Sequence, residues 1–138
     1  MKNFVIGTLI VLAFGCAGSL PPDVAPTFKR AHAGLEEIAG CELPDHYRLL
    51  PSDQGAVSSA HVPYGVAWWD EEPTVYVVPV HWRSKSKNER YRTASRELIR
   101  LSGWQHEIDE PGNLMHRDHV GHTFNAEQVE LLRGWCVR

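Results

Sequence analysis

The spacing of apolar residues along the chain predicts three helices. The first is expected to begin after Thr27, a suitable N-cap, and to stop at Gly40. Its apolar face recurs every three or four positions, at Phe28, Ala31, Leu35 and Ile38. The second helix is expected over about 89–102 and the third over about 125–135. In each helix one apolar stripe would face a core, and the opposite side would face solvent.

Two continuous apolar runs, 66–69 and 74–80, predict β-strands joined across the acidic stretch 70–73. The segment 44–60 is polar and predicts irregular structure, and 84–88 is expected to be a basic loop. Three prolines within 17–26 predict an extended tether. The sequence therefore favours one small α+β domain over residues 27–138, without an internal repeat or a second apolar stretch long enough for a bilayer.

Residues 1–15 contain one charged residue, Lys2, followed by an apolar run that is too short to span a bilayer. This pattern is typical of a secretion signal. The residues leading to Cys16 resemble a bacterial lipobox, although Ala13 stands where that motif usually has leucine. The resemblance implies that Cys16 is acylated, that 16–26 is the anchor and tether, and that the protein is exported to a bacterial membrane. The same small residues also suit an ordinary signal peptidase, which would release the protein into the periplasm or cell envelope.

The chain has three cysteines, an odd number that requires an explanation in an exported protein. Lipidation of Cys16 would leave Cys41 and Cys136 as a pair, and a disulfide between them is expected in an oxidising compartment. Two buried free thiols are the alternative.

The formal net charge is −3, and loss of Lys2 with the signal gives −3 − 1 = −4. This mild acidic balance gives no reason to expect a nucleic-acid partner. The sequence also lacks a phosphate-binding glycine loop and a nucleophile elbow. We expect a monomer whose partner, apart from the membrane, is a peptide or protein.

The string RELIRLSGWQH, from Arg96 to His106, has the spacing of the zinc-protease motif HExxHxxGxxH. Glu97, Gly103 and His106 occupy matching places, while Arg96 and Arg100 replace the first two histidines. Met115 follows in the string PGNLMH. Over roughly residues 94–115 the chain resembles the metzincin (matrixin-like) zinc metallopeptidases, with 113–115 in the place of the Met-turn.

The resemblance implies a metzincin-like domain with a short sheet, a motif helix, a Met-turn and a C-terminal helix. In this pattern the glutamate is the general base and three histidines hold zinc. A guanidinium has no lone pair for a metal, so the resemblance implies an inactive pseudoprotease without a bound cofactor. Glu97 would be a vestigial catalytic residue and His106 a vestigial ligand. Arg96 and Arg100 would line the former cleft and hold an anionic group, or would pair internally and fill it.

Three alternatives remain open on the sequence. An ordinary amphipathic helix with solvated arginines would give the same string. A second is a zinc metallopeptidase with noncanonical ligands, built from His106 together with His116, His119 and His122. A third is a small envelope lipoprotein that is unrelated to proteases.

Overall fold

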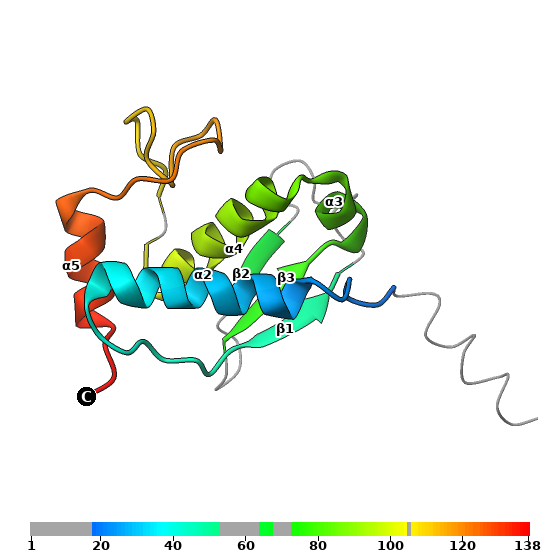
Figure 1. Ribbon diagram of the computed structural model, residues 1–138, viewed down its shortest axis with the longest axis horizontal. Helices are drawn as coiled ribbons and strands as arrows, with labels where there is room; N and C mark the ends of the chain where they lie inside the picture. Colours follow the sequence, from blue (N-terminus) through cyan, green and yellow to red (C-terminus); the bar gives the residue numbers. More distant parts are fainter. Residues whose placement is uncertain (1–17, 53–63, 68–72, 105) are drawn as a thin grey trace, which may run out of the picture.

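The computed structural model describes residues 18–52, 64–67, 73–104 and 106–138. Its elements, in chain order, are helix α2 (Val24–Ala39), strands β1 (Arg48–Pro51), β2 (Tyr64–Ala67) and β3 (Thr74–Val77), and helices α3 (Pro79–Ser84), α4 (Lys87–Leu101) and α5 (Ala126–Gly134). Figure 1 shows α3 at one end of α2 and α5 at the other. The predicted α+β class is confirmed. The lipidation residue Cys16 and the expected signal lie outside the described residues.

The described strands form one sheet in the order β1-β3-β2. β1 runs parallel to β3, and β2 runs antiparallel to it. β1 lies within the segment that was expected to be irregular, which is a correction. β1 lies at the edge of the described sheet and pairs with one strand of it only. A strand in this position, here with the short sequence RLLP, does not need a continuous apolar run. β2 begins two residues before the predicted strand, of which positions 68 and 69 lie outside the described residues.

The central strand β3 is shorter than predicted. It ends at Val77, and Pro79 occupies the first turn of the short helix α3. Proline suits the first position of a helix because its missing N–H would have no partner there, and its fixed φ matches the helix. The apolar run 74–80 therefore contains a buried strand and the start of a helix. Periodicity alone cannot separate the two.

Helix α2 begins at Val24, with Asp23 in the N-cap position, and not after Thr27. The Thr27 hydroxyl donates to the Asp23 carbonyl over 2.6 Å, within the first turn. Residues 24–26, expected in the tether, are therefore helical, and Val24 is fully buried. The predicted stop is correct, since Gly40 adopts a φ of 74°, which favours glycine.

Helices α4 and α5 begin with capping boxes. Ser86 and Glu89 exchange side-chain and backbone hydrogen bonds at the start of α4, and Asn125 and Gln128 do so at the start of α5. The core is formed by apolar side chains of α2, β3 and α4, together with Trp82, Met115 and Leu132. α4 lies against α2 and contacts β2, so the motif residues on α4 sit at the centre of the domain.

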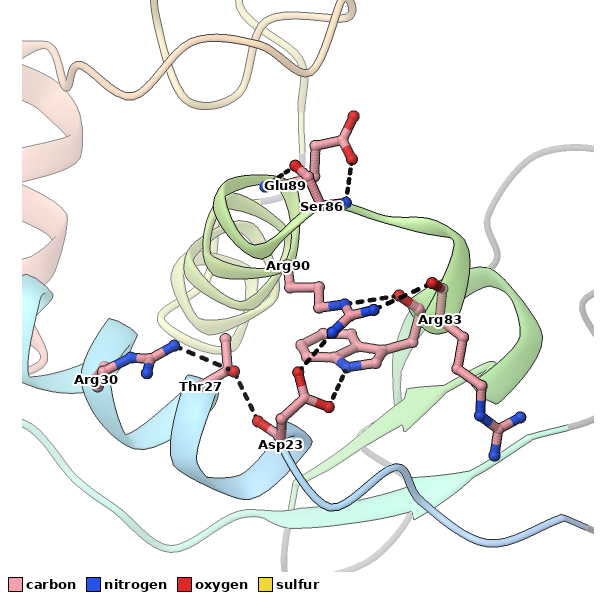
Figure 2. A network of polar contacts seen from close by, with 8 residues as sticks. Asp23, Thr27, Arg30, Arg83, Ser86, Glu89 and Arg90 are labelled. Atoms are coloured by element: carbon pink, nitrogen blue, oxygen red, sulfur yellow. Dashed lines mark hydrogen bonds and ion pairs between the residues drawn. The ribbon is translucent and has the colours of Figure 1, made fainter.

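A polar network joins the starts of α2 and α4 to α3 (Figure 2). The Asp23 carboxylate accepts from Trp82 Nε1 and from Arg90 Nη1, each over 3.0 Å. Arg90 also donates to the backbone carbonyls of Trp82 and Arg83. Burial raises the pKa of Asp23, but the bonds from Trp82 and Arg90 outweigh it and hold this pKa below its ordinary value. The network fixes the three helices relative to one another.

Cys41 and Cys136 form a disulfide, as predicted, with their Cα atoms 5.8 Å apart. Cys41 follows α2 and Cys136 follows α5. The Val137 N–H donates to the Glu42 carbonyl over 2.8 Å directly beside the bridge. None of the helices in the described part of the chain is long and apolar enough to cross a membrane.

Candidate functional site

The motif residues Arg96, Glu97 and Arg100 lie in the second half of α4. The chain leaves this helix through Gly103, whose φ of 115° is in the left-handed region, where a side chain would be strained. In the resembled motif the glycine lets the chain turn out of the helix, and the φ of Gly103 permits such a turn. The chain then returns past the helix over residues 106–124, and in this described stretch it forms no helix or named strand.

Arg96 is buried, with 4 % of its surface exposed. Its Nη1 donates to the carbonyl oxygens of Leu114 and His116, to the second over 3.1 Å, and its Nη2 lies 3.3 Å from His119 Nε2. The two carbonyls flank Met115, which is fully buried. The guanidinium therefore cross-links the motif helix to the segment in the place of the Met-turn. Burial foremost, and then the charge of Arg100, lowers the pKa of Arg96. The ordinary pKa of arginine is so high that the guanidinium stays cationic.

Arg100 pairs with Glu97. Its Nη1 donates to Glu97 Oε1 over 2.9 Å, and Glu97 is 2 % exposed. The second carboxylate oxygen, Oε2, is buried and accepts no hydrogen bond from the described residues. Burial raises the pKa of Glu97, and the two arginines only partly oppose this effect. A solvated arginine face on this helix is therefore wrong, since one arginine is buried and the other holds a buried carboxylate.

His106 is exposed, and its ring lies against that of Trp104 with the ring centroids 4.3 Å apart. The Trp104 Nε1 donates to the His106 carbonyl over 2.8 Å. In the resembled motif the turn at the glycine would bring His106 back to Arg96 and Arg100, but among the described contacts none joins them. The imidazole beside Arg96 is that of His119, which reaches it from a left-handed backbone conformation with a φ of 61°. Burial foremost lowers the pKa of His119, and the charge of Arg96 adds to this effect.

Met115 is held by a buried pair of amides. Asn113 Nδ2 donates to Gln128 Oε1 over 2.8 Å, and Gln128 Nε2 donates to Asn113 Oδ1 over 3.0 Å. The same Asn113 oxygen accepts the Met115 N–H over 2.9 Å. Gly121 lies so close to the Asn113 carbonyl and to Gly112 that a Cβ at this position would clash with backbone. The segment is thereby fixed to the start of α5, a partnership that no sequence spacing indicated.

His116 is nearly buried, and its Nδ1 lies 2.9 Å from Asp118 Oδ1. Within the described ranges no group of three or more His, Cys, Asp and Glu residues is arranged to hold a metal ion. Zinc would require lone pairs where the motif has guanidinium groups, so the residues present do not fit the metal of the resembled family.

A pocket of about 170 Å³ lies between α2, α4 and the segment 114–124. Its lining is mostly apolar and includes Leu35, Ile38, Tyr91, Leu114 and Phe124. Arg92 also lines it, and the Nε of this guanidinium is buried without a hydrogen-bond acceptor among the described residues. An apolar pocket with one incompletely satisfied cationic donor suits a ligand that combines an apolar group with an oxygen acceptor.

No protein-family model, curated protein or solved structure matches the chain significantly.

Proposed function

We propose that this protein is a catalytically inactive, metzincin-like binding protein, exported and lipid-anchored through Cys16. The observation that supports inactivity is the position of Arg96. At the place of the first zinc ligand, a buried guanidinium donates to the two carbonyls that flank Met115. A fixed positive charge there opposes binding of a dication and occupies the space between the motif helix and the Met115 segment.

The remaining motif residues are unsuited to hydrolysis. Without a metal, an attacking water keeps a pKa near that of bulk water. Glu97 is buried and bonded to Arg100, so it is not placed to accept a proton from a water in an open cleft. In this proposal Arg96 contributes the cross-link between helix and turn, and its role is structural.

The binding role belongs to the pocket between α2 and α4, because Arg96 and Arg100 already have partners inside the domain. We propose that the pocket takes an apolar side chain next to a carboxylate, as at the C-terminal residue of a peptide. Leu35 and Phe124 would contact the apolar part, and Arg92 Nε would donate to the carboxylate.

The first test is whether the motif helix still has the geometry of a zinc site. The native protein is expected to bind zinc no better than a surface histidine does and to show no peptidase activity. The double change Arg96→His with Arg100→His should give submicromolar zinc affinity. Because this variant also leaves Glu97 without its partner, zinc binding is measured together with thermal unfolding, and added zinc should restore lost stability.

Two triple variants identify the third ligand. If the metzincin-like register is correct, adding His106→Ala abolishes zinc binding by the double variant and adding His119→Ala does not. The opposite result would assign the third position to His119 and contradict the register. A double variant that folds without gaining zinc affinity contradicts the resemblance as a whole and favours an unrelated envelope lipoprotein. Tight stoichiometric zinc in the native protein, lost on changing His116 or His119, favours the noncanonical metallopeptidase.

The second test addresses the binding role with short peptides that end in Leu or Phe. Calorimetry is expected to show tighter binding for a free C-terminal carboxylate than for the amide, and Arg92→Met should remove that preference. Arg117→Met is the matched control, since Arg117 is exposed and does not line the pocket. Equal binding of both peptide forms by the native protein would contradict the role assigned to Arg92.

A further inference from the structure

The described part of the chain begins at Gly18, which lies beside the start of helix α3. A Cβ placed on Gly18 would be 3.7 Å from Cγ of Pro79, the first residue of α3. Gly18 is two positions after Cys16, and two residues span at most about 7 Å. Leu20 already packs against the core, and the Val24 N–H donates to the Pro21 carbonyl. An acyl chain on Cys16 would therefore hold α3 close to the membrane surface, without a long tether between them.

The surface at this end carries exposed basic side chains from three helices: Arg30 of α2, Arg83 of α3 and Lys87 of α4. In Figure 2 the Arg83 side chain extends away from the polar network, and this residue is exposed. The acidic groups described at this end are engaged within the fold. Asp23 accepts from Trp82 and Arg90, and Glu89 closes the capping box of α4. Nearby carboxylates therefore only partly compensate the charges of Arg30, Arg83 and Lys87, although the net charge of the whole chain is negative.

Val80, in the first turn of α3, is the most exposed of the large apolar residues described, at 67 %. It lies three positions before Arg83, so the two side chains share one side of the helix. An exposed apolar residue with cations around it is the pattern of a protein surface that rests in the headgroup region of a bilayer. No other described element covers Val80. Figure 1 shows α5 and the C-terminus at the opposite end of the molecule.

We propose that the α3 end of the molecule is its membrane-facing surface and that Arg83 and Lys87 bind anionic phospholipid headgroups there. This inference rests on the proposed acylation of Cys16. Each basic residue near an anionic membrane favours binding by about 1 kcal/mol, or roughly fivefold. Loss of both should lower the docking equilibrium constant of this surface roughly 30-fold. Raised salt should act in the same direction, because these charges are exposed.

The test uses the native acylated protein in vesicles of phosphatidylcholine, with and without 30 % phosphatidylglycerol. Intact mass first establishes the acyl chains. Amide hydrogen exchange over α3 and the start of α4 is expected to be slower in the anionic vesicles only, and 0.5 M salt should reverse the effect. Arg83→Gln with Lys87→Gln should abolish this protection. The matched control, Arg117→Gln with Arg138→Gln, makes the same change in net charge away from α3 and should preserve it.

The outcomes separate this inference from its premise. A mass without acyl chains overturns the proposed anchor. An acylated protein whose α3 exchanges equally in both kinds of vesicle overturns the headgroup contact and leaves the anchor standing. Protection centred on α5, or a control variant that loses as much protection as the Arg83 and Lys87 variant, overturns the orientation.

Discussion

The ion pair between Arg100 and Glu97 leads to a prediction whose magnitude depends on pH. Arg100→Met would leave a carboxylate that is 2 % exposed, with neither of its oxygens bonded to Arg100. Removing one partner of a buried pair costs about 3–5 kcal/mol, because the other charge stays buried and uncompensated. Since Arg100 itself is partly exposed, we expect the lower end, about 3 kcal/mol at pH 8.

The loss of stability caused by Arg100→Met should be smaller at acidic pH, because a proton can neutralise the Glu97 carboxylate. Burial raises the pKa of Glu97 in the native protein, and removal of the Arg100 charge raises it further. Above about pH 4.3, the ordinary glutamate pKa, the native variant then binds more protons than its unfolded state, so its stability falls as pH rises. The fall ends above the raised pKa. Near pH 4 both states are protonated, and only a hydrogen bond worth about 1 kcal/mol is lost.

The assay is urea unfolding at pH 4 and pH 8, with the disulfide intact, of the native protein, Arg100→Met, Glu97→Gln and the double variant. In the Glu97→Gln background the Arg100→Met change should cost nearly the same at both pH values. The comparison isolates the Glu97 interaction, since any other contact of Arg100 cancels in the cycle. A loss in the single variant that is the same at pH 4 and pH 8 would refute the reasoning.

Two further predictions concern the frame around the site. Gly121→Ala should destabilise the domain by roughly 3 kcal/mol in thermal unfolding, because the added methyl group would meet the Asn113 carbonyl. Gly134→Ala, which has open space around its Cβ, should be neutral or slightly stabilising. Equal effects of the two changes would contradict the packing at Gly121. Reduction of the Cys41–Cys136 bridge should lower the free energy of unfolding by up to about 4–5 kcal/mol, the value for a loop with a sequence separation of 95. Two reactive thiols in the denatured, unreduced protein would show that the bridge is absent.

The three longer helices could be predicted from the sequence because each has an apolar stripe and an end signal. Gly40 ends α2, and Asn125 begins α5. β1 and α3 could not be predicted, for different reasons. A four-residue edge strand has little side-chain pattern to show, and the start of α3 is hidden in an apolar run that continues from β3.

The candidate site was predicted only in part. The helix that carries Arg96, Glu97 and Arg100 was predicted, whereas the roles that the resemblance implies for them and for Met115 stay predictions. The partners were not predictable, because they come from a segment without periodic structure. The position of the His119 ring beside Arg96, for example, depends on the left-handed backbone conformation of His119 itself. The fixation of Met115 through Gln128 depends on how α5 packs, which no local pattern encodes.

The disulfide has a mechanical consequence. It joins the second residue after α2 to the second residue after α5. A pull applied between α2 and the residues after Cys136 would pass from α2 through the sulfur atoms and would bypass residues 42–135. The sheet, the motif helix and the Met115 segment would carry almost none of that load. Under such tension, the oxidised protein should lengthen by unwinding α2, and the rest of the domain should yield only after the bridge is reduced.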